Sequence, residues 1–169
     1  MYAPRHRQGP PGSGKSTLAR RLGAARGLPV FHLDQAFWRA GWQEAPKAEF
    51  AATVESWAEL PAWIIEGNYT ATLGPRLRRA DTLVYLDVPS WLSTLRVVRR
   101  SLAGWRRTRP DMADGCEERL DLGFFRFTWT WNAQSRARNL AVARDFGGRS
   151  VILRNPGRDA ALRAVLAAG

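Results

Sequence analysis

A glycine-rich segment near the start of the chain has the residue types and spacing of a phosphate-binding loop. From Gly9 to Ser16 the sequence reads G-P-P-G-S-G-K-S, which fits G-x-x-x-x-G-K-[ST]. Glycines let the backbone wrap closely around a phosphate, and a helix that begins near Lys15 adds the positive end of its dipole. In such loops the lysine reaches the β- and γ-phosphates and the serine ligates Mg²⁺. We therefore predict ATP and Mg²⁺ as ligands, with nucleotide contacts from Gly9, Gly12, Ser13, Gly14, Lys15, Ser16 and Thr17.

Three acidic side chains lie where short apolar runs end. Asp34, Glu66 and Asp87 each follow or close a run with the pattern of a strand. In open α/β sheets the carboxyl ends of the strands face the ligand crevice, which places these carboxylates near the phosphate loop. A helix N-cap is the alternative for Asp34, and a turn contact is the alternative for Glu66.

A dense basic cluster follows the third of these acids. Six arginines and no acid occur in the stretch formed by residues 96–109: Arg96, Arg99, Arg100, Arg106, Arg107 and Arg109. For the first three we favour a solvated helix face. For the last three we favour contact with phosphate, because arginine's planar fork suits bidentate phosphate binding. Arg136 and Arg138 are the next candidates, with Arg136 ahead.

The elements that would position these residues alternate between short strand patterns and longer helical patterns. This alternation favours an α/β fold with a parallel sheet. Strands are predicted at 30–33, 63–65, 82–86 and 151–153, and helices at 17–26, from 46, after 89, at 124–145 and at 159–168. Residues 103–123 contain several glycines and a proline and are predicted to be an irregular excursion.

The residues before the phosphate loop are an exception to this pattern. Such a loop should follow a buried strand rich in Val and Ile, but residues 4–8 read P-R-H-R-Q. Four or five missing apolar side chains, at ~1.5–3 kcal/mol each, compare with a total domain stability of ~5–15 kcal/mol. Two explanations stay open, an altered start or reading frame, which we favour, and a naturally degraded first strand. Either way we expect this strand to be the weakest element.

Length and composition set further limits. The 169 residues fit a single domain, 45% of them are apolar, and the net charge of +11 favours anionic partners. A GC-rich genome, which favours arginine over lysine, is the alternative source of that charge. The one cysteine, Cys116, excludes an internal disulfide and a cysteine-rich zinc site. No apolar run approaches the ~18 residues of a membrane span, and no signal peptide is present, so we expect a cytoplasmic protein without a membrane partner.

Several segments together resemble one family. They are V-F-H-L-D at 30–34, E-G-N-Y at 66–69 and T-R-P-D-M-A-D-G-C at 108–116, with further matches from Gly9 to about Leu153. The chain resembles the DNA topology modulation proteins, which are small adenylate-kinase-like P-loop proteins. The resemblance implies a three-layer α/β P-loop NTPase with a parallel sheet, formed by residues 1–169 as one domain, with a short lid insertion at about 103–123.

The resemblance also implies roles for the residues singled out above. Related kinases use an acid at the position of Asp34 to hold or deprotonate an acceptor hydroxyl. Glu66 would orient Mg²⁺-bound water, with Ser16 as the second metal-site residue, whereas Asp87 is interpreted as structural. Lid arginines close over the transferring phosphoryl group. The predicted catalytic residues are Lys15, Asp34, Arg106, Arg109 and Arg136.

Aromatic and polar neighbours of these positions complete the candidates. Trp38 and Trp42 could line an acceptor pocket, although core packing is the interpretation we favour, and His32 is interpreted as a packed core residue. Asn68 and Tyr69 could contact the acceptor.

Two functions are consistent with these residues. The first is a Mg²⁺-dependent phosphotransferase or ATPase that acts on an unidentified small acceptor. The alternative is a nucleotide-gated, DNA-associated regulator whose basic face contacts nucleic acid without sequence preference.

Overall fold

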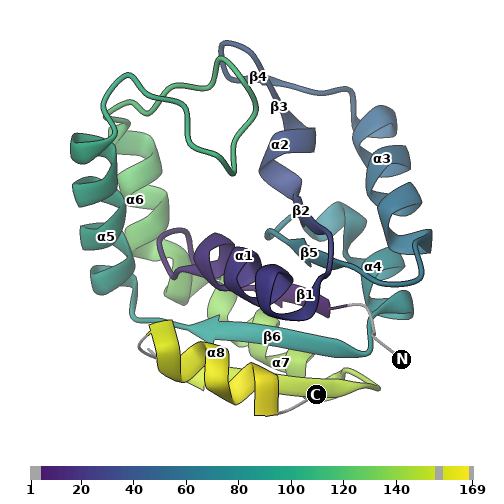
Figure 1. The fold of residues 1–169 in the computed structure, drawn as a ribbon. Coiled ribbons are helices and arrows are strands. Elements are labelled where there is room, and N and C mark those ends of the chain that lie inside the picture. The colour runs from purple at the N-terminus through teal and green to yellow at the C-terminus, as the bar shows by residue number, and fades with distance from the viewer. Residues whose placement is uncertain (1–4, 155–157, 168–169) are drawn as a thin grey trace.

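The computed structural model describes residues 5–154 and 158–167, and a parallel sheet runs through its centre (Figure 1). The five strands lie in the order β2-β5-β1-β6-β7, and every neighbouring pair is parallel. Their bounds are β1 Arg5–Gln8, β2 Val30–His32, β5 Ile64–Glu66, β6 Thr82–Asp87 and β7 Arg149–Arg154. The predicted α/β class with a parallel sheet is confirmed.

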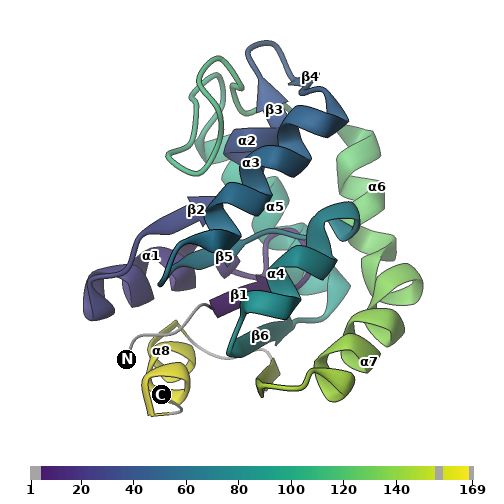
Figure 2. The same ribbon diagram turned by 90° about the vertical axis from the view of Figure 1, so that its right-hand side faces the viewer.

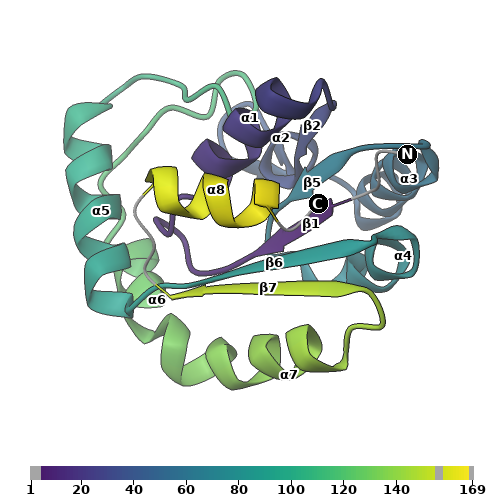
Figure 3. The ribbon, with the colours of Figure 1, turned by 60° about the horizontal axis from the view of Figure 1, so that its bottom comes forward.

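Helices cover both faces of this sheet. On one face lie α1 (Lys15–Arg26) and α8 (Arg158–Ala167), and Figure 3 shows them together above the strands. On the other face lie α3 (Lys47–Glu59), α4 (Leu73–Arg79) and α7 (Ala137–Asp145), the first two of which are seen best in Figure 2. The predicted three layers are therefore present. Helices α5 (Ser90–Ala103) and α6 (Leu122–Trp131) stand beside the sheet in Figure 1.

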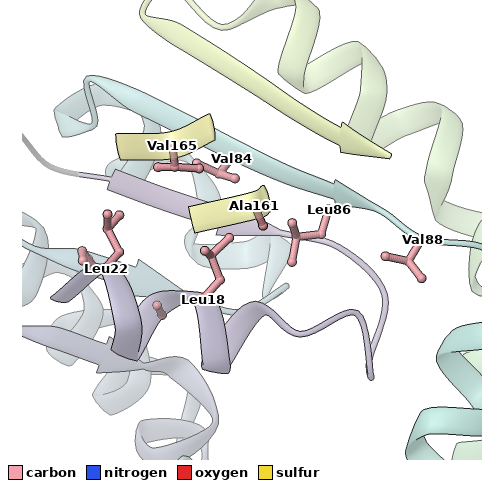
Figure 4. Close-up of a cluster of buried hydrophobic side chains, with 9 residues drawn as sticks. Leu18, Leu22, Val84, Leu86, Val88, Ala161 and Val165 are labelled. Atoms are coloured by element: carbon pink, nitrogen blue, oxygen red, sulfur yellow. The ribbon is translucent and has the colours of Figure 1, made fainter. Parts of the chain in front are cut away.

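Alternation along β6 explains how the two faces are sealed. Val84 and Leu86 point toward α1 and α8, where they join Leu18 and Ala161 in the cluster drawn in Figure 4. Leu83 and other odd-numbered residues of β6 join a second cluster against α7. Successive side chains of a strand point to opposite faces, so a strand with apolar residues throughout belongs between two helical layers.

The strand expected to be weakest occupies the middle of the sheet. Residues of β1 pair with β5 on one side, where Arg5 lies opposite Ile64, and with β6 on the other, where Arg5 lies opposite Thr82. Ladder hydrogen bonds use only backbone groups, so a polar sequence can complete the sheet. Residues 1–4, and with them the question of how the chain starts, lie outside the described residues.

Two predicted boundaries differ from the structure. Leu33 is the first residue of a short helix, α2 (Leu33–Phe37), and a hairpin of β3 (Trp38–Arg39) and β4 (Gln43–Glu44) follows it. The single helix predicted at 124–145 is divided, because a π-helical turn at Asn132–Arg136 separates α6 from α7.

The remaining features are brief. A 3₁₀ turn, η1 (Thr70–Thr72), leads into α4, and residues 104–121 form an irregular excursion, as predicted. No helix within the described ranges is long and apolar enough to span a bilayer.

Candidate functional site

The loop between β1 and α1 has the backbone of a phosphate cradle. Gly9, Gly12 and Gly14 have positive φ values of 148°, 77° and 95°. A Cβ added at Gly9 would lie 2.7 Å from the Leu86 carbonyl oxygen, and one at Gly12 would lie 2.5 Å from a carbonyl of α5. Only glycine fits these two positions. The buried hydroxyl of Ser13 has no hydrogen-bond partner within the described residues, so the loop keeps a donor for a ligand.

The lysine of this loop is buried against its own backbone. Lys15 Nζ donates to the carbonyl oxygens of Gly9 and Pro10, both at 2.9 Å. Burial lowers the pKa of Lys15, although the negative charges of Glu66 and Asp34 act in the opposite direction. A desolvated ammonium held by two carbonyls gains strongly from an anion brought into the loop.

Oxygen donors gather beside Ser16. Burial raises the pKa of Glu66, but the His32 hydrogen bond and the Lys15 charge outweigh it and hold that pKa below its ordinary value. His32 Nδ1 lies 2.6 Å from Glu66 Oε1. The Ser16 hydroxyl lies close to the carboxylates of both Glu66 and Asp111, and its single hydrogen can be donated to one of them at a time. A hydroxyl and carboxylates are the hard oxygen donors that Mg²⁺ takes, so the residues present fit the predicted ion.

Asp34 lies across the cavity from the loop and is oriented by aromatic neighbours. Tyr69 donates its hydroxyl hydrogen to Asp34 Oδ1 at 2.7 Å, and the Trp38 indole lies beside the Tyr69 hydroxyl. Burial, followed by the charge of Glu66, raises the pKa of Asp34. The N-cap of α2 is His32, without a side-chain cap bond, and Asp34 is the second residue of the helix. The helix-cap interpretation of Asp34 is therefore wrong.

A fully buried arginine organises the loop that carries Tyr69. Arg76, 0% exposed, donates to the carbonyl oxygens of Thr72 at 2.9 Å, Tyr69 at 2.5 Å and Gly67 at 3.5 Å. The same loop reaches the phosphate loop, because Asn68 Oδ1 accepts from the Gly9 backbone N–H at 3.3 Å. The Arg76 guanidinium thus supports a loop that contacts the phosphate loop through Asn68 and Asp34 through Tyr69.

The predicted lid arginines differ in position. Arg109 lines the cavity and pairs with Asp111 at 2.8 Å and with Glu118 at 2.5 Å. Arg100, on α5, also pairs with Glu118, at 3.1 Å. The side chain of Arg106 is exposed and is not among the cavity-lining residues.

Arg136 lies outside the cavity wall as well. It makes a bidentate contact with Asp87, in which both N···O distances are 2.7 Å. The structural interpretation of Asp87 agrees with this pair. Arg136 therefore binds the acid at the end of β6, whereas Arg138, two residues further along, lines the cavity.

The irregular segment 104–121 is joined to the β3–β4 hairpin across the top of the molecule in Figure 1. Three hydrogen bonds connect the two segments, from Gly41 N to Gly115 O, from Trp42 Nε1 to Glu117 O, and from Cys116 Sγ to Arg39 O. A fourth, from Gln35 Nε2 to Pro110 O, connects the irregular segment to α2. The irregular segment therefore also forms part of the cavity wall next to α2 and the hairpin.

The phosphate loop and two of the acids at the strand ends line one cavity of about 1580 Å³, together with Arg109. Its wall includes residues 11–17 of the phosphate loop, Asp34, Glu66 and Arg109. Trp38 and Trp42 also line it, and none of the three buried clusters found in the described ranges contains either one. The core interpretation favoured for these two tryptophans is therefore wrong, because both follow α2 on a hairpin that projects beyond the sheet.

Three residues of the site were not among the candidates from sequence. Asp111 lies within the T-R-P-D segment, and an acid in so distinctive a segment was the available signal. His32 was interpreted as a packed residue; it is buried, and it also contacts Glu66. Nothing in the sequence pattern distinguishes Arg76 from its exposed neighbours on α4.

Comparisons with known proteins give the fold a context. No protein-family model matches the chain, and no curated protein matches it. Among solved structures, the chain is similar to a shikimate kinase from Acinetobacter baumannii in complex with shikimate, with TM-score 0.63 and 18% identity over 99% of this chain and 93% of that one. It is also similar to a gluconokinase from Sinorhizobium meliloti 1021, with TM-score 0.59 and 14% identity over 98% and 90%.

A third likeness is to a sugar kinase from Janibacter sp. HTCC2649, with TM-score 0.57 and 13% identity over 99% of this chain and 94% of that chain. At these identities the likeness shows the fold, which is that of the P-loop kinases.

Proposed function

We propose that the protein is an ATP-dependent phosphotransferase that transfers the γ-phosphoryl group to a hydroxyl of a small acceptor. One observation carries the proposal. A single cavity contains the phosphate loop, a partly buried carboxylate with a raised pKa and a lid arginine, namely Lys15 with its loop, Asp34 and Arg109. Phosphoryl transfer depends mainly on positioning and charge stabilisation, and these groups supply both.

Each residue then has a defined role. The backbone of residues 9–17 holds the phosphates, and Lys15 and Arg109 stabilise the negative charge that develops on the transferring group. The acceptor oxygen forms the new bond to the γ-phosphorus while its proton passes to Asp34, and the bond to the β–γ bridging oxygen breaks to leave ADP. A carboxylate of raised pKa is a stronger base than an ordinary one, which suits this step.

Ser16 and Glu66 would hold Mg²⁺, which when bound neutralises phosphate charge. His32 fixes the carboxylate of Glu66 by the 2.6 Å contact, as outer partners of metal ligands do.

Family membership and domain organisation belong to the same proposal. The E-G-N-Y and T-R-P-D segments contribute Glu66, Tyr69, Arg109 and Asp111 to the cavity, which supports the resemblance to the DNA topology modulation proteins. We propose residues 1–169 as one unit, with 103–123 as its lid, and the cytoplasm as its location.

A DNA-associated regulator remains the second candidate. The observation that favours it is the exposure of Arg106 and Arg107 away from the cavity. Binding to arbitrary duplex DNA that weakens steeply with salt, without acceptor phosphorylation, would identify this function.

The deciding experiment is a phosphotransfer screen with ATP and Mg²⁺, with water as the control acceptor. Shikimate and gluconate belong in the first panel because the similar kinases carry those names. We expect Lys15→Ala to abolish ATP turnover while the circular dichroism spectrum stays that of a folded protein. Unchanged turnover in the folded variant would refute the proposal.

A further inference from the structure

The wall of the cavity beside Asp34 is aromatic rather than polar. Four rings line it, from Phe37 on α2, Trp38 on β3, Trp42 in the hairpin turn and Tyr69 after β5. Each of the four is only partly buried. Two of them, Phe37 and Tyr69, also pack against the buried cluster behind the wall, which fixes the wall to the body of the fold.

The polar edges of these rings are already used. Tyr69 donates to Asp34 at 2.7 Å, the Trp42 indole donates to Glu117 O at 3.1 Å, and the Trp38 indole N–H lies beside the Tyr69 hydroxyl. A ligand therefore finds mainly the carbon surfaces of the rings, with the Asp34 carboxylate at their border.

The rings also hold one another in place. Trp38 contacts Phe37 edge-on at a centroid distance of 5.0 Å and Trp42 at 5.5 Å, and Phe37 lies 4.6 Å from Tyr69. A wall fixed in this way favours a ligand with a flat, rigid face, because such a ligand loses little conformational freedom on binding.

The chemistry of the wall distinguishes between acceptors. An open-chain polyol presents hydroxyls along its whole length, and those facing the rings would lose water without gaining a partner. A ring presents carbon and C–H groups on its faces and hydroxyls at its rim. A ring lying on the wall can therefore direct one rim hydroxyl to Asp34 without burying the others.

We propose that the acceptor is a cyclic alcohol whose ring stacks on this aromatic wall, at Trp38, and whose reacting hydroxyl lies at Asp34. This inference rests on the proposed function and names the class of its acceptor.

The test uses two pairs of compounds, each with one cyclic and one open-chain member of the same charge. The uncharged pair is myo-inositol and sorbitol, and the singly anionic pair is shikimate and gluconate. Transfer from ATP is measured for all four with the full chain, and calorimetric titration without ATP measures their binding separately. We expect a cyclic member to be phosphorylated with kcat/KM at least about tenfold above that of its open-chain partner, the scale of one aromatic contact.

Variants of Trp38 separate stacking from hydrogen bonding. Trp38→Phe keeps a flat ring and loses the indole N–H beside Tyr69, whereas Trp38→Leu loses both. We expect Trp38→Leu to raise the KM for the cyclic acceptor about tenfold while Trp38→Phe and the KM for ATP change little. Trp91→Leu is the matched control, because Trp91 lies on α5, is 58% exposed and does not line the cavity.

The outcomes separate this inference from the proposed function. Preference for the open-chain member of either pair, equal effects of the two Trp38 variants, or no use and no binding of either cyclic compound would overturn the cyclic acceptor. The proposed function would survive all three if ATP turnover still required Lys15. Conversely, binding of a cyclic compound that depends on Trp38, without any phosphoryl transfer, would support ring stacking on the aromatic wall and refute the proposed phosphotransferase function.

Discussion

Asp34→Asn tests the central assignment of the site, because the change replaces a base with a neutral group of the same shape. Asparagine keeps an oxygen that can accept the Tyr69 hydrogen bond, which is 2.7 Å long in the native protein. The phosphate loop is untouched, so ATP binding should stay the same. Transfer should fall by roughly 10²-fold or more, the scale for a positioned general base, which corresponds to about 2.7 kcal/mol of barrier.

The same substitution should raise the stability of the folded protein near neutral pH, although it lowers phosphoryl transfer. Burial, followed by Glu66, raises the pKa of Asp34 above the ordinary 3.8, so the folded state favours its neutral form. The stability that the native carboxyl contributes is fully present below about pH 4 and is lost as pH rises through the raised pKa. At pH 7 to 8 the variant should therefore have the higher Tm, and the difference should shrink toward pH 4.

Three measurements complete this test. Product formation is followed with the acceptor found in the screen, and ATP affinity is measured by titration. Scanning calorimetry across pH 4 to 8 gives the stability difference. Intact transfer in a folded Asp34→Asn protein would refute the base assignment. A lower Tm for Asp34→Asn than for the native protein at neutral pH would show that the carboxylate stabilises the fold, which would contradict the predicted direction.

Three further predictions concern the lid, the loop after β5 and the central strand. Arg109→Ala should lower turnover more than ATP affinity, whereas Arg106→Ala, the control from the same segment, should leave turnover nearly unchanged. Equal losses of turnover in steady-state assays would instead show that both arginines contact the substrate. Arg76→Met should lower the free energy of unfolding by roughly 3 kcal/mol, because buried carbonyls lose their donor, and a change below 1 kcal/mol in urea unfolding would contradict this. Replacing Arg5–Gln8 with Val-Ile-Val-Ile should raise that free energy by at least about 3 kcal/mol, and an unchanged urea midpoint would show that a polar central strand costs nothing here.

The sequence predicted most of the sheet because β2, β5, β6 and β7 contain short apolar runs, and the first three of these runs end at or just before an acid. It also predicted the phosphate loop, where glycines occupy positions that no other residue fits. Asp34 and Glu66 were found by the same logic, since the carboxyl ends of parallel strands meet at one edge. The site assignments themselves await the experiments above.

Long-range pairing accounts for what the sequence could not predict. Arg136 resembled a candidate for phosphate contact until the fold placed it against Asp87, 49 positions earlier in the chain. The exposure of Arg106 and the burial of Arg76 likewise depend on packing, because an arginine has the same local pattern in either setting. The π-helical turn has no signal in the apolar periodicity, and its extra residue shifts the helical phase of everything after it.

In the proposed reaction, we expect the three hydrogen bonds between segment 104–121 and the β3–β4 hairpin, together with the one from Gln35 on α2, to control the rate of product release. A product larger than the remaining opening leaves only when these bonds break together, so departure is a segmental motion rather than simple diffusion. Such motions occur in microseconds to milliseconds and often limit turnover. Turnover should then slow as a viscogen thickens the solvent, and Trp42→Phe, which removes the indole N–H that bonds Glu117, should accelerate release and weaken that dependence.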